Sequence, residues 1–147
     1  MDPDRYSFIN DGDALYKGVE IEARTVPFYN FSLAANYTHV DMDSDVKGHG
    51  RHSIANVVLE YNNPQIVFVQ LYGHYVRWGK ILSPPSWNGK DGNVLWDLNL
   101  RKTLLRKGKT DLELFGTVHN LTDGSQYTAN DFHTQPRWFE TGIRVHF

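Results

Sequence analysis

The sequence contains no cysteine among its 147 residues, which excludes disulfide frameworks, thiolate zinc sites and cysteine nucleophiles. Its uninterrupted apolar stretches are a few residues long, far short of the roughly 20 residues that a membrane-spanning helix needs. An excess of charge of one sign is also absent, because 15 Lys and Arg residues oppose 17 Asp and Glu residues. This balance argues against nucleic acid as a partner. Hydropathy alone favours a water-soluble protein. The length of the chain favours about one domain.

Motifs that carry enzyme chemistry are also missing. The serines and histidines are dispersed, and no Gly-x-Ser-x-Gly segment occurs. The acidic segment Asp41-Met-Asp43-Ser-Asp45 has Val46 where a calcium loop requires glycine. We therefore expect no enzyme activity, no cofactor and no metal site, and we expect this acidic segment to be a solvated loop.

Alternation with a period of two residues is what the sequence has in quantity, whereas helical periodicity is scarce. Aromatic residues reach 14% of the chain. The alternation predicts an all-β fold of seven or eight antiparallel strands. Most are longer than the usual five or six residues and match the roughly 9–11 that a tilted strand needs to cross a bilayer. The predicted strands are Tyr16–Arg24, Phe31–Asp41, His52–Asn62, Gln65–Trp78, Asn93–Leu104, Thr110–Asn120 and Arg137–Phe147, with a short eighth at Asp4–Ile9.

The connections between these strands alternate in length. Three are tight links, at Val26–Asn30, Asn63-Pro64 and Leu105–Lys109. The other three are longer, polar loops, at Asp41–Arg51, Gly79–Gly92 and Leu121–Pro136. Short turns at one rim and long loops at the other are typical of outer-membrane β-barrels.

Each predicted strand divides into an apolar and a polar face, because successive side chains point to opposite sides. A soluble sheet with one face on a core gives the same alternation. However, the chain offers no helix to cover the apolar face, and its aromatic residues gather near strand ends, as in an interfacial girdle. The apolar list includes Val57, Leu59, Val69, Leu71, Leu98 and Leu114, and the polar list includes Glu60, Gln70, Asp97, Asn99 and Glu113.

Several segments together resemble the barrel of TonB-dependent outer-membrane receptors. Val118-His-Asn-Leu-Thr-Asp123, a loop through Tyr127 and the segment Gln135-Pro-Arg-Trp-Phe-Glu-Thr-Gly142 are similar to the closing hairpin of that family. Asn10–Glu22 resembles a recurring piece in which an Asn-x-Gly-x-Ala loop leads into Gly-Val-Glu. The segment Glu140–Phe147 resembles the C-terminal signal that the barrel assembly machinery recognises. The resemblance covers nearly the whole chain but only the last third or so of a family barrel.

The resemblance implies that residues 1–147 are the C-terminal part of a receptor in the bacterial outer membrane, without the plug domain and the TonB box. Such receptors import a scarce ligand, most often a ferric siderophore, and would contact TonB only through the missing plug. The outer-membrane lipid and the assembly machinery are further implied partners. Candidates for ligand contact are the loop residues Trp87, Tyr127, Phe132 and His133, and the candidate assembly signal consists of Gly142, Ile143, Val145 and Phe147.

Two other interpretations remain open at this stage. One is a complete outer-membrane barrel of eight strands, structural or adhesin-like, without a transport role. The other is a soluble β-barrel binding module of the lipocalin type, which would need the apolar list to face inward.

Overall fold

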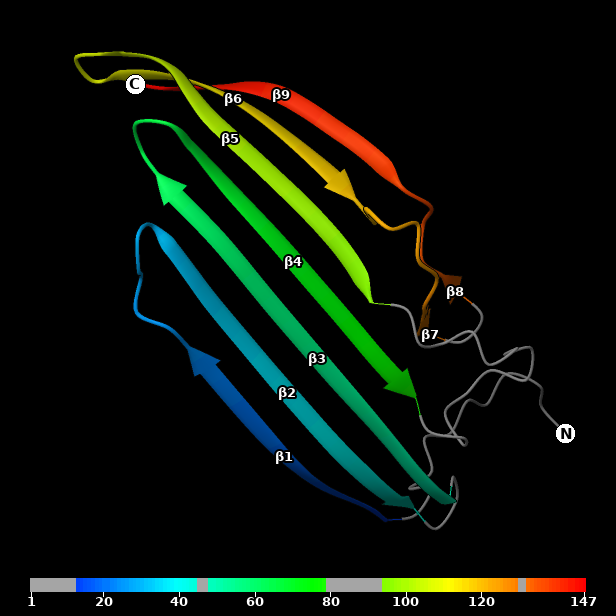
Figure 1. Cartoon of the computed structure of the whole chain (residues 1–147). Helices are drawn as coiled ribbons and strands as arrows, with labels where there is room; N and C mark the ends of the chain where they lie inside the picture. The colour runs from blue at the N-terminus through cyan, green and yellow to red at the C-terminus, as the bar shows by residue number, and fades with distance from the viewer. Residues whose placement is uncertain (1–12, 45–47, 79–93, 130–131) are drawn as a thin grey trace, which may run out of the picture.

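The chain folds as one sheet of long antiparallel strands, which we describe from a computed structural model over residues 13–44, 48–78, 94–129 and 132–147 (Figure 1). The predicted all-β class is confirmed, and the described residues contain no helix. In particular, they include no helix long and apolar enough to cross a membrane. The strands are β1 (Ala14–Arg24), β2 (Phe31–Ser44), β3 (Gly48–Asn63), β4 (Val67–Trp78), β5 (Leu95–Lys107), β6 (Thr110–His119), β7 (Tyr127–Ala129), β8 (Phe132–His133) and β9 (Trp138–His146).

Seven strands form the main sheet in the order β1-β2-β3-β4-β5-β6-β9, and β7 and β8 form a separate small hairpin. All neighbouring pairs are antiparallel. The seven long strands of the sequence prediction are therefore confirmed, whereas the predicted strand Asp4–Ile9 lies outside the described residues. The β7–β8 hairpin was not predicted, because strands of two or three residues are too short to show alternation.

The predicted loop at Asp41–Arg51 is wrong in its extent. Pairing of β2 with β3 continues through Asp41 and Arg51 as far as Ser44 and Gly48. The Arg51 Nε lies 3.8 Å from the Asp41 Oδ1, so opposite charges face each other across the strands. Polar composition suggested a loop here, but cross-strand pairing also accommodates exposed polar residues.

Tight turns close the strand pairs at one end of the sheet (Figure 1). Tyr29 and Asn30, between β1 and β2, both have positive φ angles, of 47° and 68°, as a type I′ turn requires. Gly108 has a φ of 62° and is the first residue of the two-residue turn that joins β5 to β6. The tight link predicted at Leu105–Lys109 is thus shorter than expected, because β5 continues to Lys107.

The strand ends at this rim are staggered. Across the sheet, Phe31 lies level with Tyr61, Val69 and Leu100. The β1–β2 turn immediately precedes Phe31, whereas β5 continues for seven further residues beyond Leu100, to Lys107. The turns consequently step along the sheet from β1–β2 to β5–β6 (Figure 1). Tilted strands in β-barrels show this kind of stagger.

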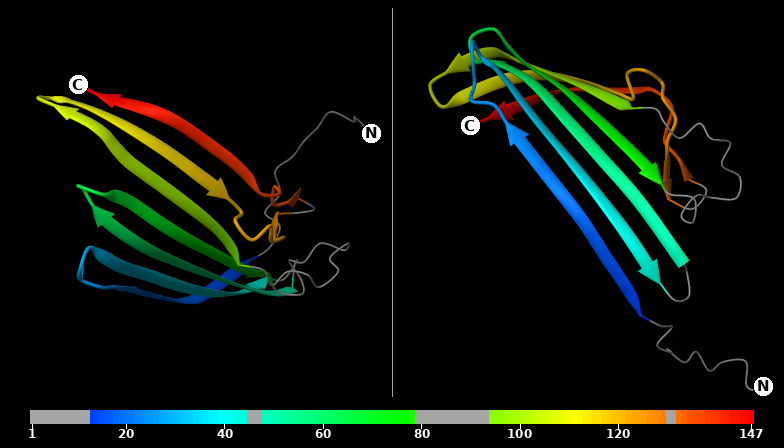
Figure 2. Two further views of the ribbon diagram at one scale, coloured as in Figure 1. Left: turned by 45° about the horizontal axis from the view of Figure 1, so that its top comes forward. Right: turned by 60° about the horizontal axis from the view of Figure 1, so that its bottom comes forward.

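The sheet is a single, curved layer (Figure 2). No large side chain of the described residues is fully buried, and Met42 and Val76 are the hydrophobic residues that count as buried. Within the described chain, β1 and β9 each have one neighbouring strand, so the sheet is open at both edges. The described residues therefore lack the two-layer hydrophobic core on which water-soluble domains depend.

Candidate functional site

The register places the two residue lists on opposite faces of the sheet, as the alternation predicted. Leu59, Leu71 and Leu98 are cross-strand partners on one face, and Glu60, Gln70 and Asn99 are partners on the other. The first face is called the apolar face and the second the polar face. The polar face carries most of the side-chain hydrogen bonds and is the candidate functional surface.

A continuous row of hydrogen bonds crosses five strands on the polar face. The Ser32 hydroxyl donates to Glu60 over 3.3 Å, and the Gln70 amide donates to the other Glu60 oxygen over 2.8 Å. The Asn99 amide donates to Gln70 over 3.1 Å, and the Thr117 hydroxyl donates to Asn99 over 2.8 Å. Because each amide both donates and accepts, the row fixes the side chains of β2 to β6 relative to one another.

A second row lies nearer the long-loop end. The Asn56 amide donates to the Asn36 Oδ1 over 2.8 Å. The Asn56 Oδ1 accepts from the Tyr72 hydroxyl over 2.9 Å and from the His74 Nδ1–H over 2.6 Å. These bonds join β2, β3 and β4.

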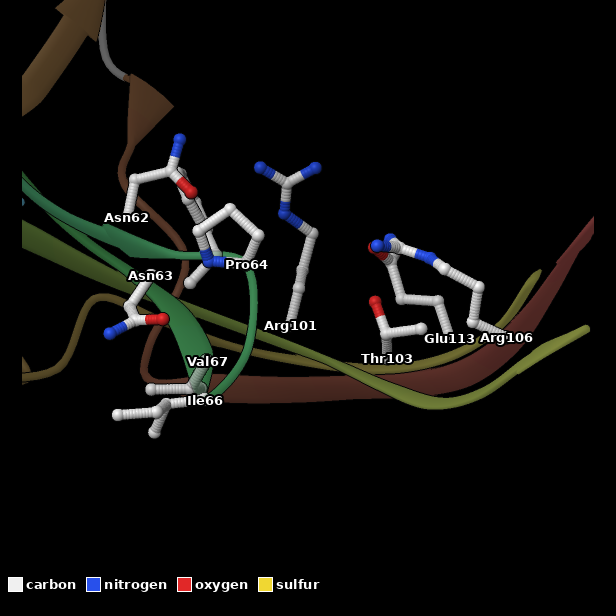
Figure 3. A pocket seen from close by; sticks show the side chains of 10 residues that line it. Asn62, Asn63, Pro64, Ile66, Val67, Arg101, Thr103, Arg106 and Glu113 are labelled. Atoms are coloured by element: carbon white, nitrogen blue, oxygen red, sulfur yellow. The ribbon is translucent and has the colours of Figure 1, made fainter.

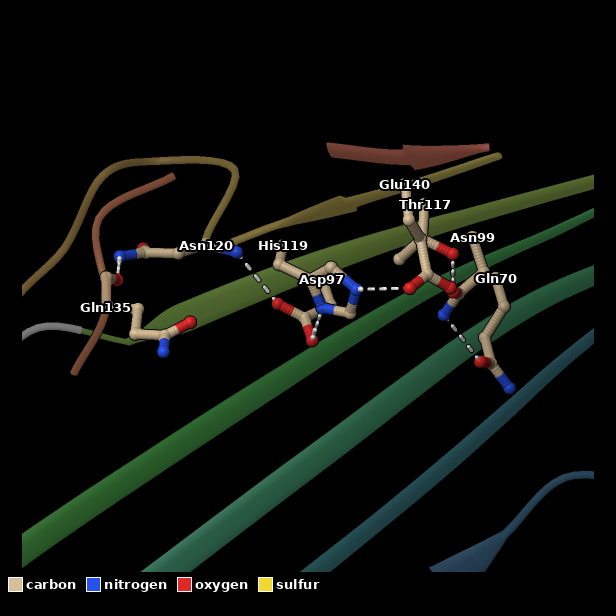
Figure 4. Close-up of polar contacts among 8 residues, drawn as sticks. All are labelled: Gln70, Asp97, Asn99, Thr117, His119, Asn120, Gln135 and Glu140. Atoms are coloured by element: carbon tan, nitrogen blue, oxygen red, sulfur yellow. Dashed lines mark hydrogen bonds and ion pairs between the residues drawn. The ribbon is translucent and has the colours of Figure 1, made fainter. Parts of the chain in front are cut away.

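A cluster of ionisable groups joins β5, β6 and β9 (Figure 4). The His119 Nδ1 lies 3.2 Å from the Asp97 Oδ2, and its Nε2 lies 3.9 Å from the Glu140 Oε2, too far for a hydrogen bond. The His119 ring stacks on Trp138 with 3.9 Å between ring centroids. The two carboxylates face different nitrogens of one imidazole. The cluster is therefore arranged to orient His119 and to hold the last strand against β6.

An open hollow of about 440 Å³ lies on the polar face, lined by residues from β3, β4, β5, β6 and β9. Two guanidinium groups line it. That of Arg101 lies 3.9 Å from the centre of the Phe68 ring, and that of Arg144 lies 5.2 Å from the Phe115 ring and makes a 3.0 Å ion pair with Glu113. A smaller hollow, of about 210 Å³, continues toward the short turns, and Figure 3 shows Arg101 between its two sides.

The chemistry of this surface is that of polar contact. Amides, hydroxyls, carboxylates and guanidinium groups line the hollows, and they can bind water, a polar solute or a polar protein surface. No group of three or more His, Asp or Glu residues in the described ranges is placed to hold a metal ion.

The segment after β6 is anchored by Asn120 and Asp123, two residues of the closing-hairpin motif. Asn120, 6% exposed, donates to the carbonyls of Gly124 and Gln135 and accepts from the Gly124 N–H. Asp123 accepts from the backbone N–H of Arg137 over 2.8 Å. Both Asn120 and Asp123 have positive φ, of 50° and 54°, a conformation that Asn and Asp tolerate better than most residues. In the sequence, the signal for this anchor was an Asn and an Asp three residues apart.

The predicted ligand-contact residues are only partly placed. Trp87 lies outside the described residues. Tyr127 is the cross-strand partner of His133, and Ala129 that of Phe132, so the short hairpin brings these three predicted residues together along the backbone. Gln126 ties this hairpin to the sheet, because its side-chain amide donates to the His74 carbonyl over 3.0 Å.

The predicted assembly residues lie on or just after β9, the edge strand. Ile143 and Val145 are on the apolar face, opposite Leu114 and Leu112, and Phe147 is 98% exposed. Gly142 has a packing role of its own, since a Cβ built there would lie 2.7 Å from the Phe115 ring.

Comparisons with known proteins add no relative. No protein-family model matches the chain, and no curated protein and no solved structure is significantly similar to it.

Proposed function

We propose that this chain forms part of the wall of an outer-membrane β-barrel, in a receptor of the TonB-dependent kind that imports a scarce ligand such as a ferric siderophore. The observation that carries the proposal is the single-layer sheet with one apolar face and one hydrogen-bonded polar face. In this proposal, lipid covers the apolar face and the polar face lines the lumen.

Exposure of the apolar face supports lipid as its cover. Leu33, Leu59, Leu100 and Leu114 are each 42–43% exposed, and Ile143 is 65% exposed. Burial of apolar surface stabilises a fold by roughly 25 cal/mol per Å². A sheet with such a face in water therefore lacks its main source of stability. A hydrocarbon layer removes this face from water without a second protein layer.

The rims of the apolar face also suit a bilayer. At the short-turn end, the tilted rings of Phe31 and Tyr61 pack across the strands with 4.8 Å between ring centroids. Farther along the same face, Tyr37 and Tyr75 are level with each other on either side of Ala55. Aromatic rows on both sides of an aliphatic band are typical of membrane barrels.

The receptor family is proposed from the closing-hairpin motif. Asn120 and Asp123 hold the two ends of the segment that carries Tyr127 and His133, at the end of the sheet where β6 ends and β9 begins. In a receptor, such outer segments would contact the ligand, and the polar face would surround the plug and the transport path.

A soluble barrel of the lipocalin type is less well supported. Such a module needs an apolar interior, whereas the hollows of this sheet lie on its polar face, lined by Glu60, Gln70, Asn99 and Arg101. A small closed barrel remains the competing membrane interpretation. It would require β1 to pair with β9 or with an additional strand, whereas a receptor barrel would pair β1 and β9 with further strands.

The test of transport is uptake of radioactive iron by iron-starved cells that produce the complete protein carrying this chain. Iron is supplied separately as citrate, catecholate and hydroxamate chelates. We expect deletion of the gene to abolish uptake of one chelate, and loss of TonB to abolish the same uptake. Unchanged uptake of all three would contradict iron transport, and outer-membrane location without any energy-dependent uptake would favour the structural barrel.

A further inference from the structure

We infer that the tip of the β5–β6 hairpin binds the phosphate groups of anionic phospholipids at the membrane surface. This inference rests on the proposed barrel function. It concerns the surface formed by Lys102, Leu104, Leu105, Lys107 and Lys109, which is called the basic tip.

Charge on the basic tip is concentrated and largely unopposed. Arg106 is neutralised by Asp111, with Nε 3.1 Å from Oδ1. Within the part of the chain that the structure describes, Lys102, Lys107 and Lys109 have no carboxylate at ion-pair distance. Three exposed ammonium groups therefore lie within eight residues of one hairpin.

Apolar side chains accompany these cations. Leu104 and Leu105 are 52% and 57% exposed, on the same strand as Lys102 and Lys107. Lys102 lies on the apolar face itself, opposite Leu114 and two residues from Leu100. A lysine in that position can lay its aliphatic stem along the leucines and extend its ammonium group to the membrane surface.

The place of the hairpin in the sheet fits the same partner. It extends seven residues beyond the level of Phe31, at the rim formed by the short turns (Figure 1). At the edge of an apolar face, leucines can contact the acyl chains of the lipid while the neighbouring lysines contact its phosphates. The lysines could also bind the phosphates of a nucleic acid, but the exposed leucines would have no partner there.

The test is partition of the complete protein that carries this chain into vesicles, measured by flotation. Neutral vesicles contain phosphatidylcholine alone, and anionic vesicles contain phosphatidylcholine mixed with phosphatidylglycerol. The test variant is K102Q/K107Q/K109Q, and the matched control is K17Q/R51Q/R77Q, which removes the same charge at the other end of the sheet. Each basic residue near an anionic surface contributes about fivefold to binding, so we expect the test variant to lose at least tenfold of the preference for anionic vesicles.

The expected pattern is strong binding to anionic vesicles that weakens with salt, is retained by the control variant, and is not displaced by inorganic phosphate at matched ionic strength. Equal loss in the two variants, or no preference for anionic vesicles, would overturn the inference. So would displacement by free phosphate, or binding of a DNA duplex in place of vesicles. Failure to enter even neutral vesicles would instead contradict the proposed barrel function, so the two failures are distinguishable.

Discussion

At the residue scale, two glycines of the sheet lie opposite large aromatic side chains. A Cβ on Gly73 would lie 2.7 Å from the Trp96 ring and 2.9 Å from Val57, so the indole covers the glycine across the strand pair. Phe115 covers Gly142 in the same manner on the polar face. These glycines provide room for large rings beside the backbone and are not sites of positive φ.

Substitution of Gly73 tests this packing. We expect Gly73→Ala to destabilise the fold by about 1–3 kcal/mol, because the methyl group displaces Trp96 or Val57. Gly116→Ala is the control, since its Cβ would meet only a carbonyl oxygen, at 3.8 Å. The measurement is urea unfolding in the same detergent for both variants, and equal losses would show that ring packing is not the cause.

The two faces also differ in what they tolerate. If Leu98 faces lipid, Leu98→Arg should cost roughly 2–4 kcal/mol near mid-membrane, while Asn99→Arg on the neighbouring polar position should cost far less. Unfolding free energies in lipid vesicles provide the measurement. Equal costs would indicate a sheet with water on both faces.

At the scale of single elements, the strands were predictable and their ends were not. Alternation identified all seven long strands because one face of each is apolar along most of its length. The extensions of β2 and β3 past Asp41 and Arg51 could not be predicted, since polar side chains outside the apolar band carry no alternating signal. The bulge between Thr103 and Leu105 also escaped prediction, because the two consecutive apolar residues Leu104 and Leu105 leave the phase of alternation undefined.

The candidate site was also predictable only in part. Alternation alone places Gln70 and Asn99 on the same polar face, but it does not show that the two side chains are in contact. Their hydrogen bonds depend on register, which a single sequence does not define across 29 residues. The role of Asn120 depends on a positive φ and on contact with Gln135, neither of which alternation reports.

Asn120 provides the prediction for the segment between β6 and β9. Asn120→Ala removes hydrogen bonds to the carbonyls of Gly124 and Gln135 and to the Gly124 N–H, and each such bond contributes about 0.5–1.5 kcal/mol. We expect faster amide hydrogen exchange from Gly124 to Arg137 with the long strands unaffected. Thr122→Ala, at an exposed neighbouring position, is the control, and identical exchange in both variants would contradict the anchoring role.

At the scale of the whole molecule, the described residues form an open single-layer sheet, with one neighbouring strand at each edge and no second layer on either face. Circular dichroism of the folded chain should show less than about one-fifth helix, below the usual third of mixed folds. A higher helix content would contradict the architecture as a whole.

Assembly provides a second prediction at this scale. Phe147, exposed at the end of β9, should serve recognition by the assembly machinery. Deletion of Phe147 in the complete protein should lower the amount inserted in the outer membrane, while the inserted molecules keep normal ligand affinity. Unchanged insertion with reduced affinity would contradict the assembly role.

The orientation of the two faces is the central claim, and the absence of cysteine makes it directly measurable. Single cysteines at Leu59, Leu71 and Leu98, and at Glu60, Gln70 and Asn99, can each carry a nitroxide label in the membrane-inserted protein. If the apolar face meets lipid, labels at the three leucine positions are accessible to oxygen dissolved in lipid and protected from a water-soluble nickel chelate. Labels at the polar positions should lack this lipid accessibility. Equal accessibility of both sets to the nickel chelate, or the reverse pattern, would contradict the account.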